Sequence, residues 1–149
     1  YGGTASNPVT DGSLAFIAGL DQSVWAFDSF GSLGWRYRTP GPVRAQPAVF
    51  GTVLYVEIPQ QGLTALGSAD GSVKWSNRDV TGTVIAVRGS SLFVWNAKTS
   101  TITLVDAARG DVIATAASPG IVQLFTDGGE NSPIYAVSDK GVVARFVRR

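Results

Sequence analysis

The sequence AFDSFGSLGW (26–35) has a close copy, ALGSADGSVKW (65–75), further along the chain. In both copies a glycine is followed four residues later by a tryptophan. A third version, LVDAARGDVIA (104–114), keeps the glycine and has alanine in place of the tryptophan. Self-similarity at a constant interval of this size is typical of solenoids and propellers. The aligned positions, whose glycines lie 40 and 39 residues apart, are Gly31, Gly71 and Gly110, followed by Trp35, Trp75 and Ala114.

Two further sets of residues repeat at nearly the same interval. An apolar segment before the glycine turn recurs at spacings of 40, 38 and 42 residues, aligned on Leu14, Leu54, Leu92 and Ile134. The segment leading into the turn recurs at spacings of 39, 39 and 40 residues, aligned on Ala26, Ala65, Leu104 and Ala144. We therefore predict a single segment over 1–149 that is built from four repeats, and the fourth repeat contains only three of the four segments. The repeats cover approximately 5–41, 42–82, 83–120 and 121–149.

Each repeat consists of short segments that are rich in β-branched and aromatic residues and bounded by Gly, Asp, Asn, Ser or Pro. This composition is typical of strands and tight turns. Most segments are apolar at consecutive positions, which indicates sheets covered on both faces, whereas a two-sheet sandwich would show clearer alternation. The sequence therefore predicts an all-β fold, a β-propeller of four-stranded antiparallel blades, as part of a larger ring of seven or eight blades.

The repeated turn has a physical interpretation. Asp28 and Asp106 can accept hydrogen bonds from backbone N–H groups two residues further on, and the glycine supplies the backbone freedom that a tight turn requires. Trp35 and Trp75 then stand on the outermost strand, where a large ring can lie against the neighbouring blade. We expect these residues to be structural.

Composition restricts the functions that are open to the chain. Of 149 residues, 44% are hydrophobic and 15% are charged, and the net charge is +1. A balanced, scattered charge disfavours binding to nucleic acid, which requires a basic surface. The chain has no cysteine, so it has no thiolate to act as a nucleophile or metal ligand. It also has no histidine, which is the commonest general base and metal ligand in proteins. No apolar run approaches the roughly 20 residues of a membrane span.

The turn pattern resembles the repeat of PQQ-like (quinoprotein-like, BamB-like) β-propellers, and the resemblance covers essentially the whole chain. The chain departs from the pattern where the first turn is one residue shorter, where Gly67 replaces the Asp, and where Ala114 replaces the Trp. Some members of this family are PQQ-dependent dehydrogenases, and others are non-enzymatic scaffolds of the bacterial envelope. The resemblance implies that blades are missing, to be supplied by the rest of a longer chain or by a second copy, unless the four blades stay open.

Little in the sequence resembles the quinoprotein catalytic site. The resemblance would require an Asp base and a calcium beside PQQ, often with a vicinal disulfide, and the chain has no cysteine pair. The carboxylates of Asp106, Asp111, Asp127 and Glu130 stand beside glycines or turns, so we interpret them as surface turn residues. The loop FTDGGENSP (125–133), with Asp127, Glu130 and Asn131, resembles a calcium loop in composition only. It lacks the spacing of an EF-hand, and we interpret it as a hairpin loop.

Five residues are candidates for an interaction surface: Trp25, Arg36, Tyr37, Arg38 and Trp95. The segment WRYRTP (35–40) places arginines on one side of a strand and aromatic rings on the other, a mixture that is enriched in interface hot spots and also fits a solvated edge strand. Trp25 stands where other repeats have Thr64, Thr103 and Val143, and Trp95 where they have Ile17, Glu57 and Val137. Each tryptophan either fills a local gap or is presented to a partner.

The sequence therefore favours a non-enzymatic scaffold that uses no cofactor, binds protein partners and lies outside the cytoplasm of a bacterium. The alternative is a fragment or subunit of a PQQ-dependent oxidoreductase. Binding of a carbohydrate or another small ligand through exposed aromatic rings is a further possibility.

Overall fold

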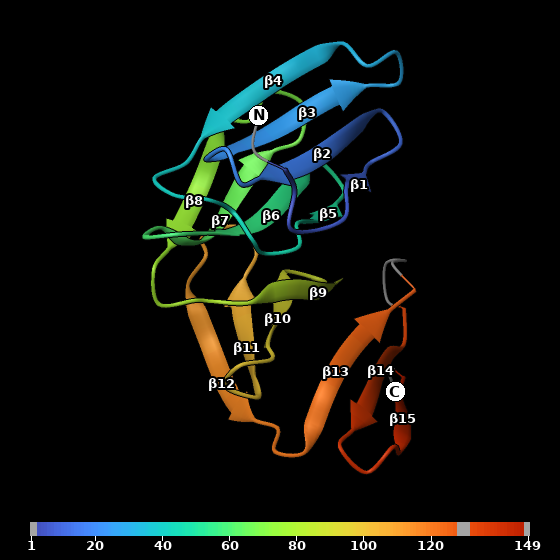
Figure 1. Ribbon diagram of the computed structural model, residues 1–149. Helices are drawn as coiled ribbons and strands as arrows, with labels where there is room; N and C mark the ends of the chain where they lie inside the picture. Colours follow the sequence, from blue (N-terminus) through green and yellow to red (C-terminus); the bar gives the residue numbers. More distant parts are fainter. Residues whose placement is uncertain (1–2, 128–131, 148–149) are drawn as a thin grey trace. The chain divides into compact units, whose positions relative to one another are not determined.

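The computed structural model describes residues 3–127 and 132–147, and these residues form strands and turns without any helix (Figure 1). The chain forms two compact units, Tyr1–Thr83 and Val84–Arg149, and each is described by itself below. The predicted all-β fold of antiparallel blades is confirmed: three sheets have four strands and the last has three. Each sheet is a meander whose strands are hydrogen-bonded in sequence order.

The first unit contains two blades. Blade 1 consists of β1 (Val9–Thr10), β2 (Leu14–Gly19), β3 (Ser23–Asp28) and β4 (Leu33–Arg38). Blade 2 consists of β5 (Ala48–Phe50), β6 (Val53–Ile58), β7 (Gly62–Gly67) and β8 (Val73–Asn77). Within each of these blades the strands have 2–6 residues and the connections between them have 2–5, so short segments suffice to build a complete meander.

The core of the first unit lies between these two blades. We call the face of a blade that is turned towards the next blade in the sequence its forward face, and the opposite face its rear face. The forward face of blade 1 contributes alternate residues of its strands: Phe16, Ala18, Val24, Ala26 and Trp35. The rear face of blade 2 contributes Leu54, Val56, Ile58 and Leu66. Side chains alternate between the faces of a strand, so each blade has one face for each neighbour. This explains why the segments are apolar at consecutive positions.

Trp35 anchors blade 1 to blade 2. Its ring is 8% exposed, and its indole Nε1 donates a 2.7 Å hydrogen bond to the backbone oxygen of Ser68. The ring lies against Gly71, where a Cβ atom would come within 2.6 Å of Cε3 of the indole. Gly71 has a φ of 71°, so this position favours glycine for its backbone conformation and for the space that the ring occupies. A tryptophan of one repeat therefore docks on the glycine turn of the next.

Strand pairing defines which residues of the blades are equivalent, and it corrects one alignment made from the sequence. Phe16 pairs with Ala26 and Tyr55 with Ala65, and each of these alanines in turn pairs with the tryptophan of its blade. Phe16 is therefore the counterpart of Tyr55, which places Leu14 one position away from the residue that matches Leu54. The aromatic pairs Phe16–Trp35 and Tyr55–Trp75 have similar centroid distances of 5.8 and 6.0 Å.

The second unit contains the other two sheets. Blade 3 consists of β9 (Thr83–Arg88), β10 (Ser91–Asn96), β11 (Thr101–Asp106) and β12 (Val112–Ala117). Blade 4 consists of β13 (Ile121–Thr126), β14 (Ile134–Ser138) and β15 (Val143–Phe146). Two side chains donate hydrogen bonds that link blades 3 and 4. Thr126 Oγ1 donates to the backbone oxygen of Ile85 at 3.1 Å, and Arg88 Nη2 donates to that of Ser132 at 3.0 Å. A second apolar cluster joins these blades and consists of Ala86, Trp95, Leu124, Ile134 and Ala136.

Candidate functional site

The rear face of blade 1 is the surface that most resembles a binding site. In blade 2 the equivalent face is covered by blade 1, and its residues Val56, Thr64 and Leu66 are 0–1% exposed. In blade 1 the matching positions are Ile17, Trp25 and Phe27, and all three are only partly buried. Aromatic rings replace threonine and leucine at two of these three positions, so this face presents a larger planar surface than its counterpart.

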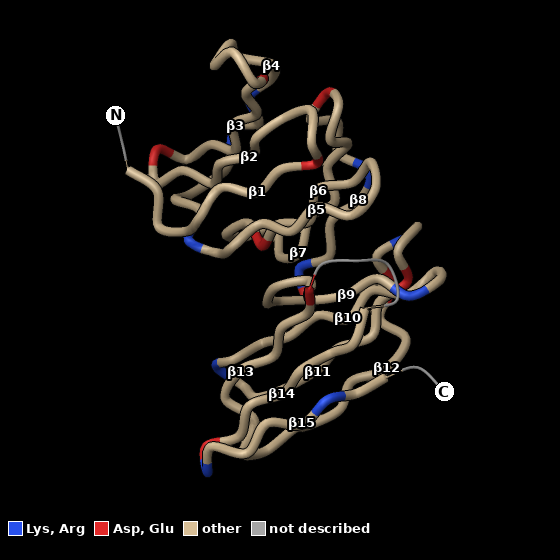
Figure 2. The backbone as a smooth tube through the Cα atoms, turned by 90° about the vertical axis from the view of Figure 1, so that its right-hand side faces the viewer, with Lys and Arg blue, Asp and Glu red and all other residues tan. Residues whose placement is uncertain are grey.

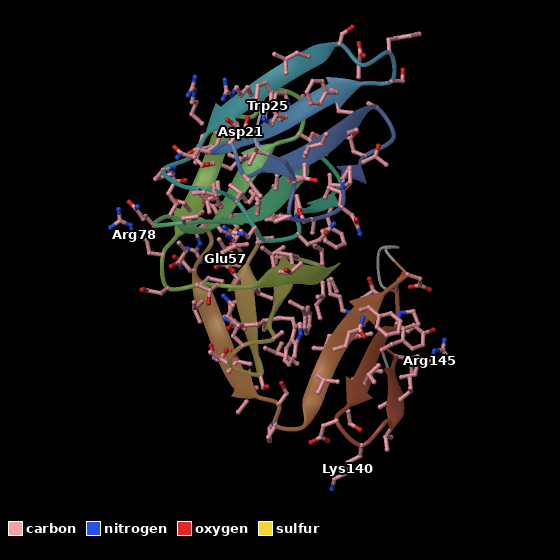
Figure 3. The ribbon with its side chains drawn as sticks, viewed as in Figure 1. Asp21, Trp25, Glu57, Arg78, Lys140 and Arg145 are labelled. Atoms are coloured by element: carbon pink, nitrogen blue, oxygen red, sulfur yellow. The ribbon has the colours of Figure 1, made fainter. Side chains whose placement is uncertain are left out.

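A network of four side chains, which we call the Trp25 cluster, holds this face in place: Asp21, Ser23, Trp25 and Arg36. Trp25 and Arg36 are direct cross-strand partners on β3 and β4, so their side chains share one face. The Arg36 guanidinium lies 4.2 Å from the centroid of the Trp25 ring, within the range of a cation–π contact. Figure 3 labels Trp25 and Asp21 side by side on this blade.

Hydrogen bonds position both the ring and the cation of the cluster. The indole Nε1 of Trp25 donates to the two carboxylate oxygens of Asp21, at 3.2 and 3.1 Å. Arg36 Nε donates to Ser23 Oγ at 2.9 Å, and its Nη2 lies 3.8 Å from Asp21 Oδ2. The Arg36 side chain is 29% exposed and that of Asp21 is 22% exposed, so the ion pair remains accessible. Pairs of this kind add little stability in water and mainly orient the groups that they join.

The other candidates on β4 face in different directions. Arg38 is exposed on the same side as Arg36. Tyr37 is on the opposite side and packs against the core of the first unit, where its hydroxyl donates to Gln61 Oε1 at 3.2 Å. The alternation of WRYRTP therefore separates the set: Arg36 and Arg38 lie on the same face as Trp25, while Tyr37 belongs to the contact between blades 1 and 2.

Trp95 does not belong to an exposed surface. It is 6% exposed and lies in the apolar cluster of the second unit. Strand pairing makes Glu57 and Ala18 its counterparts, so a large ring stands where blade 1 has a small residue. Of the two interpretations of this tryptophan, the filling of a local gap matches its burial.

The repeated turns show how the chain replaces one capping group by another. Asp28 Oδ1 accepts hydrogen bonds from the N–H groups of Phe30 and Ser32, at 2.9 and 2.8 Å. Asp106 Oδ1 likewise accepts from Ala108 and Arg109, at 3.0 and 2.9 Å.

In blade 2, where Gly67 stands in place of the aspartate, the later residue Asp70 accepts from the N–H and hydroxyl of Ser72. A Cβ at Gly67 would lie 2.7 Å from Asp70 Oδ1, so the glycine makes room for this carboxylate. The Ser72 N–H and hydroxyl together hold the pKa of Asp70 below its ordinary value.

The acidic residues do not form a metal centre in the described part of the chain. Among residues 3–127 and 132–147, no three His, Cys, Asp or Glu side chains are grouped as metal ligands. Asp106 and Asp111 instead flank Arg109, whose Nε lies 3.9 and 3.3 Å from their carboxylates. Asp127 is exposed, while Glu130 and Asn131 of the predicted loop lie outside the described residues. Figure 2 shows the charged residues scattered along the backbone of both units.

A shallow polar depression of about 410 Å³ adjoins β1 and β5 in the first unit. It is lined by Thr4, Ala5, Ser6, Asn7, Arg44 and Gln46. The Gln46 side chain accepts from the Asn7 N–H and donates to the Asn7 oxygen, both at 3.0 Å, as a neighbouring strand would. This arrangement ties the N-terminal segment to blade 2. Among the described residues, no helix is long and apolar enough to cross a membrane.

Four successive antiparallel meanders, the first of which docks its tryptophan on the glycine turn of the second, define the class of β-propeller repeats. The family model described as outer membrane protein assembly factor BamB matches residues 2–146. The chain belongs to this family, which confirms the resemblance that the repeats indicate.

Solved structures show the same fold. The crystal structure of BamB from Moraxella catarrhalis is 18% identical, with a TM-score of 0.73 over 97% of this chain and 44% of that chain. The computationally designed Ika4 protein is 12% identical, with a TM-score of 0.70 over 99% of this chain and 92% of that chain. Quinohemoprotein alcohol dehydrogenase from Comamonas testosteroni is 16% identical, with a TM-score of 0.65 over 97% of this chain and 35% of that chain. No match was found among the curated proteins.

The chain spans less than half the length of the BamB structure that it matches. At these identities the likeness shows the fold alone, and BamB and an alcohol dehydrogenase share it.

Proposed function

We propose that the chain is a non-enzymatic PQQ-like β-propeller scaffold that binds protein partners in the bacterial cell envelope. Membership of the BamB family supports this role and location. The observation that carries the proposal is the Trp25 cluster, in which a cation held over an aromatic ring lies on an accessible blade face. Tryptophan and arginine are the residues that most often dominate the binding energy of protein interfaces.

The Trp25 cluster is suited to a protein partner because its polar groups are already oriented. Binding must immobilise the side chains of an interface, and a group that is held beforehand loses less conformational entropy. Arg36 has a hydrogen bond to Ser23 and a ring beneath it, so its guanidinium is presented in one position. A partner carboxylate or backbone oxygen could accept from its remaining N–H groups.

We also propose that further blades complete a ring with this segment, supplied by the rest of a longer chain or by a second copy. The comparison of Gly31 with Gly71 supports this. At Gly71 the ring of Trp35 fills the space beside the glycine, whereas at Gly31 an added Cβ would meet no atom within 4 Å. Gly31 has a similar φ of 80°, so the same docking position stands open on blade 1. A blade that docked there would cover the rear face of blade 1, so such a blade and a separate protein partner are alternative occupants of the Trp25 cluster.

The scaffold role is tested by capturing partners from an envelope extract with the wild-type chain and two variants. Trp25→Ala and Arg36→Ala should each lose a partner that the wild type retains, and titration with the purified partner should show at least about tenfold weaker binding. Phe30→Ala serves as the control, because Phe30 is 92% exposed and lies outside the cluster. Equal binding by all four proteins would contradict the assignment of this surface.

The oxidoreductase alternative makes a separate prediction about cofactor uptake. A quinoprotein subunit should bind PQQ together with Ca²⁺, which is measured by the absorbance of the protein after gel filtration. We expect no retained PQQ at stoichiometric concentrations. Tight one-to-one binding would overturn the scaffold proposal and favour the alternative.

A further inference from the structure

The outermost strand of blade 3, β12, is unusual in this chain. All six of its residues, VIATAA (112–117), are exposed, and none of them is charged. The strand forms the edge of its sheet, where the described residues place β11 on one side and no strand on the other. An exposed edge strand presents unpaired N–H and C=O groups to any other strand, and proteins block such edges with charged side chains, prolines or β-bulges. The outer strands of blades 1, 2 and 3 all contain a bulge, so charge is the feature that distinguishes them.

The outer strands of blades 1 and 2 are blocked in this way. Strand β4 carries Arg36 and Arg38, and strand β8 carries Lys74. Because Ala114 is the counterpart of Trp35 and Trp75, Ile113 takes the position of Lys74 and Thr115 that of Arg36. Strand β12 therefore has neither the tryptophan nor a charged residue at any of these positions, which leaves an open edge of small and β-branched residues.

We propose that β12 pairs with β12 of a second copy of this chain, antiparallel about a two-fold axis at Thr115. A two-fold axis makes each contact occur twice, so the strand must be complementary to itself. With Thr115 opposite Thr115, Ala114 lies opposite Ala116 of the other copy. Ile113, the bulged residue of β12, then comes beside Ala117, so the largest side chain lies next to a small one. The pairing would satisfy the open backbone groups of both edges and join the two sheets of blade 3 into one.

Charge favours a second copy as the occupant. In this register Asp111 extends beside Pro119 of the other copy, so no charged side chain meets its own kind. The same pairing of two β4 strands would place Arg36 opposite Arg36 of the other copy, and like charges directly opposite each other destabilise a sheet. Self-pairing is therefore available to β12 and disfavoured for its counterpart in blade 1.

Sedimentation velocity over a range of protein concentrations tests the proposal. The wild-type chain should form a dimer, and Thr115→Arg and Thr115→Glu should each remain monomeric because like charges would meet at the axis. An equal mixture of the two variants should recover the dimer, because the opposite charges then face each other. Val142→Lys is the control and should dimerise as the wild type does, since Val142 is 62% exposed and lies outside the strand.

Three results would overturn the proposal: a wild type that stays monomeric at every concentration, a Thr115→Arg variant that dimerises normally, or a mixture that stays monomeric. The second result would indicate a dimer formed by completing a ring, which is a different interface. The proposal does not depend on the Trp25 cluster, so partner capture and dimerisation can fail independently.

A disulfide trap measures the register directly. The chain has no cysteine, so a single Thr115→Cys substitution can form only an intermolecular disulfide. Opposed residues of antiparallel strands have Cα atoms about 4.5–5.5 Å apart, within the range for a disulfide. Mild oxidation should convert Thr115→Cys to a covalent dimer and leave Val142→Cys largely monomeric. Equal cross-linking of the two variants would contradict the register.

Discussion

Trp35 shows how one residue can join two blades. Its indole N–H finds a backbone acceptor on the next blade, and its ring covers a glycine whose φ is positive. Neither contact requires a particular partner side chain, because Ser68 contributes only its backbone oxygen and Gly71 contributes open space. This explains how the first two repeats differ in their turns while both keep the glycine and the tryptophan.

A pair of glycine substitutions separates backbone strain from this docking contact. Alanine at Gly31 meets only the strain of a positive φ, and we expect it to lower the free energy of unfolding by about 1 kcal/mol. Alanine at Gly71 has the same strain and also clashes with the buried Trp35 ring, so it should lose about 1–3 kcal/mol more. Urea denaturation measures both. Equal losses would contradict the docking contact.

The pKa of Asp70 makes a prediction about pH. A pKa that is lower in the folded chain contributes stability above the unfolded value, and this contribution is lost as the pH falls through the folded value. Ser72→Ala removes the hydroxyl donor to Asp70 and should raise the carboxyl pKa, as measured by ¹³C NMR titration. Ser72→Thr keeps a hydroxyl and serves as the control. A titration midpoint that does not move in Ser72→Ala would count against this hydrogen bond.

Among the strands, the sequence predicted the elements and the turns better than it predicted the register. Four spaced segments per repeat and a glycine turn after the third suffice to place the strands, because turns and β-branched segments are local signals. The alignment of Leu14 with Leu54 is one position out, since strands that are apolar on both faces carry no alternation to set the register. For the same reason the sequence aligns Trp95 with Ile17, although its counterpart in blade 1 is Ala18.

The two tryptophans of blade 1 should differ in their effect on stability. Trp35 is buried between blades, so Trp35→Ala should lower the free energy of unfolding by about 3–5 kcal/mol. Trp25 is partly buried and held by surface contacts, and Trp25→Thr, which copies Thr64 of blade 2, should lose only about 1 kcal/mol. Thermal and urea denaturation compare them. A loss for Trp25→Thr as large as that for Trp35→Ala would contradict its assignment to an open surface.

For the molecule as a whole, the sequence identified the family and half of the candidate site. Trp25 could be named because its aromatic ring departs from the pattern of the other repeats, and Arg36 because the segment WRYRTP mixes arginines with aromatic rings. Asp21 and Ser23 could not, because a turn aspartate and a strand serine carry no signal until the fold brings them to the ring and the guanidinium. The likeness covers 92% of the Ika4 chain and 44% of the BamB chain, so the same blades occur in chains of very different length.

The packing of one blade on the next through Trp35 is tested most directly by the NMR spectrum of the Gly71 α-protons. Because the indole ring lies where a Cβ of Gly71 would be, one α-proton should be shifted upfield by the ring current and show nuclear Overhauser contacts to Hε3 and Hζ3 of Trp35. The α-protons of Gly31, where an added Cβ would meet no atom within 4 Å, should show neither effect. Gly71 α-protons with ordinary shifts and no contact to the indole would contradict the stacking of these repeats as blades.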